Sequence, residues 1–120
     1  MSQLIDLPTH KNERGCLTVI EKVLPFDIKR VYYIYNANGV RGGHRHKKAI
    51  QALICVHGEC SVYSNNGEVK ECFLLDSPSK CLILQPEDYH TMQDFSSDAV
   101  LLVLASDFYD ENDYIWENYE

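Results

Sequence analysis

The sequence predicts an all-β protein that forms one small domain, and three observations lead to this prediction. Short runs rich in β-branched and aromatic residues recur along most of the chain, and turn-forming residues separate them. The chain has 120 residues, a length that suits a single hydrophobic core. The run Ala99–Ala105 is apolar throughout, which is typical of a strand buried on both faces. Many short strands at close spacing favour a sandwich or a barrel.

The expected strands follow one another with only short turns between them. They are Cys16–Val23, Arg30–Asn36, His44–Val56, Glu59–Tyr63, Glu68–Leu75, Lys80–Leu84, His90–Asp94 and Ala99–Ala105. The clearest hairpin turn is Ser64-Asn65-Asn66-Gly67, because an Asn-Gly pair readily adopts positive φ angles. The acidic segment Ser106–Glu120 is expected to be irregular or weakly helical. No repeat or linker divides the chain, so we expect one domain over residues 1–120.

Composition and charge exclude several classes of protein. Hydrophobic residues make up 45% of the chain, which is too many for a disordered protein. The formal net charge of −7 argues against nonspecific binding to nucleic acid or to an anionic membrane. No signal-peptide core and no long apolar stretch are evident, and the five cysteines lack C-x-x-C spacing. We therefore expect a cytoplasmic protein with reduced cysteines.

His44 and His46 are the strongest functional signal. Residues two apart point to the same face of a strand, so these two imidazoles lie side by side. They indicate either a metal site or a proton-transfer site. Gln51 favours the second, because an amide brings no charge and a single oxygen to a divalent ion. Imidazoles free of metal keep a pKa near neutrality and can transfer protons at physiological pH.

The spacing of these residues resembles the cupins, which are small jelly-roll β-barrels. A cupin metal site typically has H-x-H, a Glu three or four residues later, a Gly six residues further on and a later His. Here Gln51 stands in the place of the Glu, while Gly58 and His90 match the other positions. Because Gln51 lies five residues after His46, strict alternation places the two on opposite faces. A bulge or break near residues 47–49 would return Gln51 to the site; otherwise it does not belong there.

Four segments make the resemblance more specific. They are Pro25–Ile34, Arg41–Lys48, Leu75–Pro78 and Asp94–Ile115, and together they resemble the nucleotide-sugar 3,4-ketoisomerases of the WxcM-like or FdtA-type cupin group. The resemblance implies conversion of dTDP-4-keto-6-deoxyglucose to a 3-keto sugar, without metal or organic cofactor. The product would serve the synthesis of 3-amino-3,6-dideoxy sugars for surface glycans such as lipopolysaccharide O-antigen.

The resemblance also implies roles for the histidines. Such an isomerisation removes the proton at C3, passes through an enediol and returns a proton to C4. The resemblance implies His46 as the base at C3 and His44 as the acid or shuttle near C4 and the oxygens. His90 is expected to contact the sugar or the diphosphate. Arg14 together with His90 resembles the branch that forms the galacto-configured 3-keto sugar.

Further residues suit the binding of a nucleotide diphosphate. Arg41 can reach the diphosphate with its planar guanidinium, and Arg14 and Arg30 are further candidates if they are not surface charges. Tyr33 and Tyr35 share one face of their strand and could stack on thymine or contact the sugar, unless they only pack in the barrel.

Alternation places Tyr32 on the face opposite that of its two tyrosine neighbours.

The family resemblance suggests a homodimer in which N-terminal strands are exchanged, so that Arg14 completes the partner's site. Two other functions stay open, namely a metal-dependent cupin enzyme and a non-catalytic module that binds a nucleotide sugar. Retention of a metal by the purified protein would favour the first, and binding of the sugar without change would favour the second.

Overall fold

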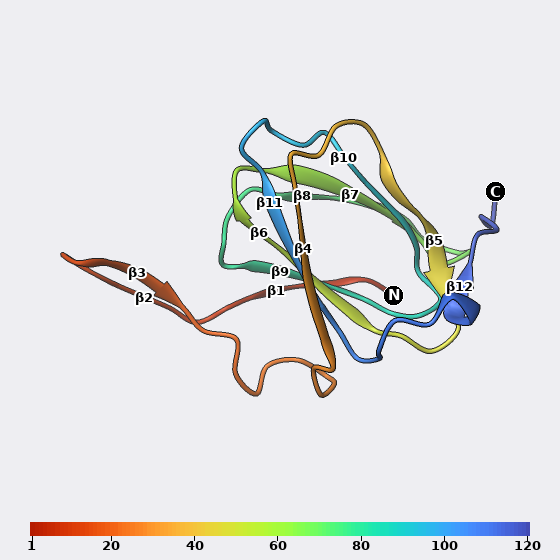
Figure 1. Cartoon of the computed structure of the whole chain (residues 1–120), viewed down its shortest axis with the longest axis horizontal. Coiled ribbons are helices and arrows are strands. Elements are labelled where there is room, and N and C mark those ends of the chain that lie inside the picture. The colour runs from red at the N-terminus through yellow and green to blue at the C-terminus, as the bar shows by residue number, and fades with distance from the viewer.

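The computed structural model describes residues 1–120 and is built almost entirely of antiparallel strands (Figure 1). The strands are β1 (Gln3–Asp6), β2 (Thr9–Asn12), β3 (Gly15–Thr18), β4 (Arg30–Tyr35), β5 (Arg41–His46), β6 (Gln51–His57), β7 (Cys60–Asn65), β8 (Lys70–Leu75), β9 (Lys80–Leu84), β10 (Tyr89–Gln93), β11 (Val100–Ala105) and β12 (Tyr114–Ile115). The one helical element is a 3-10 turn, η1 (Glu111–Asp113). None of the chain forms a helix with the length and apolarity needed to cross a membrane.

Two five-stranded sheets form the body of the molecule. The first has the order β1-β9-β6-β11-β4, and the second has the order β12-β5-β10-β7-β8. The main core lies between them, where Leu53 of β6 and Val103 of β11 meet Val62 of β7. No strand of one sheet pairs with a strand of the other, so the barrel is not closed. The predicted all-β class and small cupin-like architecture are confirmed, with an open rather than a closed barrel.

The first sheet is buried on both faces at its centre. Leu101 and Val103 of β11 contribute to the core between the sheets, whereas Leu104 belongs to a second cluster on the outer face. Residues 19–26 cover that outer face, with Ile20 and Phe26 packed against the second cluster. The apolar run at residues 99–105 is therefore a buried strand, as its composition predicts.

Two predicted strands have the wrong extent. The run predicted as His44–Val56 is interrupted at residues 47–50, and its halves become β5 in one sheet and β6 in the other. This is the break that the spacing of His46 and Gln51 requires if both are to reach one site. The run predicted as Cys16–Val23 ends as a strand at Thr18, because the residues that follow leave the ladder to cover the first sheet.

The strands β2 and β3 form a hairpin of their own, which we call the arm (residues 9–18). They pair only with each other in a separate two-stranded sheet, and nearly all of their residues are exposed. Figure 1 shows the arm projecting from one end of the longest axis, while β5 and β12 lie at the opposite end. Along that axis the molecule extends 48 Å.

Candidate active site

Three histidines meet where β5 lies beside β10. His44 and His46 share a face of β5, and His90 of β10 stands directly opposite His44 in the ladder. The ring centres of His44 and His46 are 5.0 Å apart, and those of His44 and His90 are 4.9 Å apart. Each ring has one buried nitrogen without a hydrogen-bond partner in the protein, namely His44 Nδ1, His46 Nε2 and His90 Nε2. Buried polar atoms are normally paired, so these nitrogens are available to a ligand.

Gly42 sets the close approach of β5 to β10. Its φ of +85° favours glycine, and a Cβ atom added there would lie 3.0 Å from both the His90 carbonyl oxygen and the Met92 sulfur. On the other strand the register shifts between His90 and Thr91, which is a β-bulge. The glycine and the bulge together align His44 with His90.

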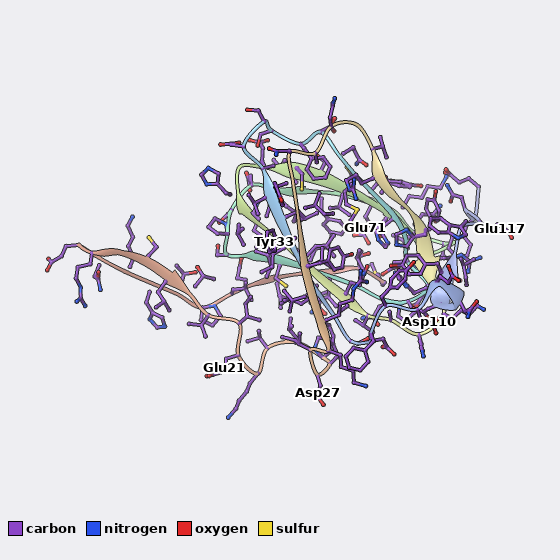
Figure 2. The ribbon with its side chains drawn as sticks, viewed as in Figure 1. Glu21, Asp27, Tyr33, Glu71, Asp110 and Glu117 are labelled. Atoms are coloured by element: carbon purple, nitrogen blue, oxygen red, sulfur yellow. The ribbon has the colours of Figure 1, made fainter.

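The C-terminal segment adds three side chains to the site. Asp110 caps η1 by accepting a hydrogen bond from the Asn112 N–H, and β12 then pairs with β5 so that Tyr114 stands opposite His46. The Tyr114 ring lies 4.6 Å from the ring centres of both β5 histidines, and Trp116 lies 5.4 Å from His44. In Figure 2, Asp110 and Glu117 mark this segment at the β5 end of the molecule.

Asp113 is the third of these side chains and contacts His46 directly. His46 Nδ1–H donates to the Asp113 carboxylate at 2.9 Å, and both side chains are about 5% exposed or less. The backbone N–H groups of Lys47 and Lys48 donate to the other carboxylate oxygen, at 3.2 and 2.8 Å. The segment that interrupts the two strands is therefore tied to the C-terminal segment through one carboxylate.

The pKa values of the histidines are displaced to different degrees. Burial, and then the neighbouring His46, lowers the pKa of His44 from 6.5 to about 4. Burial, together with His44, lowers the pKa of His90 to about 3. Burial also lowers the pKa of His46, but the hydrogen bond that His46 donates to Asp113, and the negative charge of Asp113, oppose this shift. All three rings are neutral at pH 7, and only His46 has a carboxylate to stabilise its protonated form.

Burial alone would raise the pKa of Asp113, but the Lys48 N–H and His46 hold it below its usual range. The Asp113 side chain is therefore an ionised carboxylate at neutral pH, and it can only accept hydrogen bonds.

An open cavity of about 430 Å³ lies beside His44, between β4 of the first sheet and β5 of the second. It contains two cationic side chains and four tyrosines, and its lining is Arg30, Tyr32, Tyr33, Ile34, Tyr35, Arg41, Gly42, His44, Met92 and Tyr114. Its volume lies in the range typical of small-molecule sites. Arginines beside aromatic faces and neutral imidazoles suit a ligand with an anionic part and an uncharged part.

The sequence-predicted binding residues divide between the wall and the rim of this cavity. Tyr33 and Tyr35 lie at the rim, and their side chains are 63% and 61% exposed. Their rings are 5.9 Å apart, and Figure 2 labels Tyr33 beside β4. Arg41 lines the cavity beside His44, and Arg30 lies with its guanidinium 4.4 Å from the centre of the Tyr32 ring.

Gln51 reaches the site through Tyr32. Its amide N–H donates to the Tyr32 hydroxyl at 3.3 Å, and its side chain is almost completely buried. Alternation places Tyr32 opposite Tyr33 and Tyr35, and the face with Tyr32 is the inward one, packed against the core and lining the cavity. No three His, Cys, Asp or Glu side chains are arranged as ligands of one metal ion.

Arg14 is the predicted site residue that the fold does not bring to the cavity. It lies in the turn of the arm, at the opposite end of the molecule from β5. Within a single chain, Arg14 therefore contacts none of His44, His46 and His90.

Sequence reasoning missed Asp113, Tyr114 and Trp116 as site residues. They belong to a segment expected to be irregular, and the strand that positions them, β12, is only two residues long. The aspartate and aromatic residues in Asp113-Tyr114-Ile115-Trp116 were the available signal, but nothing local reveals that this segment pairs with β5.

This chain is similar to known proteins in both sequence and structure. A profile of the family described as FdtA (WxcM-like, C-terminal) matches residues 1–120. The TDP-4-oxo-6-deoxy-α-D-glucose-3,4-oxoisomerase of Aneurinibacillus thermoaerophilus is 50% identical over 108 residues, which are 87% of this chain and 78% of that protein.

Two solved structures are similar over nearly the whole chain. A 3,4-ketoisomerase from Helicobacter canadensis matches with a TM-score of 0.92 at 38% identity, covering 97% of this chain and 90% of that one. A histidine-to-asparagine mutant of the 3,4-ketoisomerase from Thermoanaerobacterium thermosaccharolyticum, in complex with TDP-4-keto-6-deoxyglucose, matches with a TM-score of 0.92 at 41% identity. The match covers 97% of this chain and 87% of that one.

Proposed function

This chain belongs to the FdtA (WxcM-like) family and is a TDP-sugar 3,4-ketoisomerase, and we propose that it converts dTDP-4-keto-6-deoxyglucose by proton transfer at His46 and His44. The observation that carries the proposed mechanism is the pair of neutral imidazoles on β5, each with a buried and unpartnered nitrogen: His44 lines the cavity, and the ring centre of His46 lies 5.0 Å from that of His44. The chemistry moves only protons, so it requires neither a metal nor an organic cofactor.

The proposed reaction begins at His46. Its neutral ring removes the proton at C3, and the electrons of that bond form the double bond of an enediol as O4 takes up a proton. The proton on O3 is then lost as the C3 carbonyl forms, and C4 receives a proton. A neutral imidazole is a suitable base at pH 7, and such a positioned group contributes about 10²–10⁴-fold in rate.

His44 is suited to a different part of the same reaction. Its pKa of about 4 makes a long-lived imidazolium costly, so it serves better as a shuttle that accepts a proton on one nitrogen and releases one from the other. We assign it to transfer near C4 and the two oxygens. His90, across the ladder from His44, is assigned to contact with the sugar.

The nucleotide part of the substrate is assigned to the rim of the cavity. Arg41 and Arg30 supply cationic donors for the diphosphate, which a chain with net charge −7 must provide locally. Tyr33 and Tyr35 offer exposed aromatic faces for thymine. Gln51 is assigned an indirect part, because it holds the hydroxyl of Tyr32 in the cavity wall.

The product is proposed to have the galacto configuration and to supply an aminotransferase that makes 3-amino-3,6-dideoxy sugars. The configuration rests on the resemblance of Arg14 and His90 to the branch with that outcome. We also propose that the enzyme works in the cytoplasm, where its five free cysteines would stay reduced.

We further propose a homodimer in which the arms are exchanged. The arm pairs with nothing else in its own chain, and Leu17 on it is 59% exposed. Exchange would bring Arg14 to the cavity of the partner, where it could contact the substrate.

Mixing an Arg14→Ala variant with a His46→Asn variant tests the exchange of arms. Heterodimers should regain activity in about half of their sites, since one site of each pair then has both residues intact. Sedimentation should show a dimer at micromolar concentration. Absence of recovery after subunit exchange has been demonstrated would show that each site is built within one chain.

The activity itself is tested by NMR of the product formed from dTDP-4-keto-6-deoxyglucose. We expect the 3-keto sugar, with the coupling of the C4 proton reporting the galacto configuration. The gluco-configured 3-keto sugar would contradict only the stereochemical proposal. Recovery of unchanged substrate would contradict the proposed substrate.

A further inference from the structure

We propose that Asp113 is a positioning residue of the reaction, which fixes the tautomer of His46 and stabilises its protonated form. The catalytic part of this inference rests on the proposed function. The contact from which it starts belongs to the folded protein and can be measured without any substrate.

The first step of the argument is the geometry of the pair. An ionised carboxylate can only accept, so the hydrogen on His46 must sit on Nδ1, 2.9 Å from the Asp113 oxygen. This leaves Nε2 as the nitrogen with a free lone pair, and Nε2 is buried and has no partner in the protein. The contact therefore presents the basic nitrogen of His46 to the site.

The second step is that the Asp113 carboxylate is held on several sides. Besides His46, the backbone N–H groups of Lys47, Lys48 and Ala49 donate to it at 2.8–3.3 Å. The backbone of Asp113 is fixed as well, because its N–H donates to the Asp110 carbonyl and its carbonyl accepts from the Lys47 N–H. A carboxylate held in this way keeps the imidazole in one orientation, as the partners of catalytic histidines commonly do.

The third step is the contrast among the three histidines. The Nδ1–H of His90 donates to the backbone carbonyl of Asp88 at 3.1 Å, which fixes a tautomer but adds no negative charge. His44 has no carboxylate partner at all. When the C3–H bond breaks and its proton moves to Nε2, the new positive charge on His46 lies between Asp113 and the negative charge that develops on the substrate. Only His46 can therefore hold the proton at low cost while the enediol forms.

The test compares Asp113→Asn with Asp110→Asn. In the first variant the amide oxygen can still accept from the Lys47 and Lys48 N–H groups, so the loop keeps part of its anchor. The amide N–H then faces His46 Nδ1 and donates to it, which moves the histidine hydrogen to Nε2. Asp110→Asn removes the same charge three residues earlier and keeps a good N-cap, without contact to a histidine.

We expect Asp113→Asn to lower kcat by roughly 100-fold or more, with KM within about threefold, because the loss concerns proton transfer and not binding. Asp110→Asn should stay within about twofold of the unmodified enzyme. The nitrogen shifts of ¹⁵N-labelled histidine, assigned with a His46→Asn variant, should show hydrogen on Nδ1 in the unmodified protein and on Nε2 in Asp113→Asn.

Three outcomes would overturn the inference. These are hydrogen on Nε2 of His46 in the unmodified protein, near-native kcat in Asp113→Asn, and a loss of kcat with unchanged tautomer and a lowered melting temperature. The first needs no variant, so it decides the matter even if Asp113→Asn fails to fold. If the unmodified protein does not isomerise the nucleotide sugar, the proposed function fails while the tautomer measurement stands on its own.

Discussion

The two ends of the molecule are built in opposite ways. At the β5 end, short segments from far apart in the sequence converge, and side chains from different segments meet, such as Asp113 with His46. At the other end, the arm pairs only with itself and leaves its side chains in solvent. The comparison teaches that the histidine cluster and Asp113 come together within one chain, whereas the strands of the arm pair with no other strand of that chain.

The largest expected effect is at the β5 end. His46→Asn or His44→Asn should lower kcat by roughly 1,000-fold or more and leave the Kd for TDP nearly unchanged, because the missing function is proton transfer. Steady-state kinetics and calorimetry would measure both quantities. Near-native kcat in both variants would show that the proton chemistry lies elsewhere.

Gly42→Ala should come next, since it disturbs the alignment of His44 with His90. The added Cβ meets the His90 carbonyl oxygen at 3.0 Å in a backbone conformation with φ of +85°. Strain of this kind costs about 1–3 kcal/mol, so both the melting temperature and kcat should fall. Gly39→Ala is the matched control, because that glycine also has a positive φ but open space around its Cβ. Equal losses of kcat in the two variants would contradict the role of the close approach.

Arg41→Ala should act on binding more than on chemistry. A charge-assisted contact to the diphosphate exists before and during the reaction, so KM should rise roughly tenfold while kcat changes little. The effect should shrink as salt is added. Lys29→Ala removes an equal charge from an exposed position near β4 and serves as the control. A loss of kcat at unchanged KM would place Arg41 in the chemistry instead.

Acid should weaken the β5 end before it affects the arm. The pKa values of His44 and His90 are lowered from 6.5 to about 4 and about 3, chiefly by burial. Between pH 6.5 and these lowered values, the unfolded chain therefore binds more protons than the folded protein. Their contribution to stability is complete above pH 6.5 and is lost as the pH falls through this window. The melting temperature should drop by about 5 °C or more between pH 7 and pH 5. His44→Asn should reduce that drop; an undiminished drop would contradict the assignment.

The smallest expected effect on stability is at the arm. Arg14→Ala removes an exposed side chain in a turn, so the melting temperature should change by less than about 2 °C. Activity should fall nonetheless if the arm reaches the cavity of a partner. Unchanged activity would show that Arg14 takes no part in the reaction.

The sequence was a good guide to the strands between Arg30 and Ala105, whereas β1, β2 and β12 were not among the expected strands. His44 and His46 share a face because of their spacing, and of the two alternatives that the parity of Gln51 left open, the structure has the break after His46. The inward direction of Tyr32 could not be read from alternation, since alternation gives two faces without saying which one meets the cavity. Asp113 and Trp116 were missed because a two-residue strand has no periodic signal, and its partner lies about 70 residues away in the chain.

Hydrogen exchange at C3 of the substrate tests the central claim most directly. The unmodified enzyme, His44→Asn and His46→Asn are each incubated with dTDP-4-keto-6-deoxyglucose in deuterated water, and the C3 proton is followed by NMR. We predict that the unmodified enzyme forms the 3-keto sugar with deuterium at C4, and that His46→Asn leaves the C3 proton of the substrate in place. Loss of the C3 proton in His46→Asn at the rate of the unmodified enzyme would show that His46 is not the base.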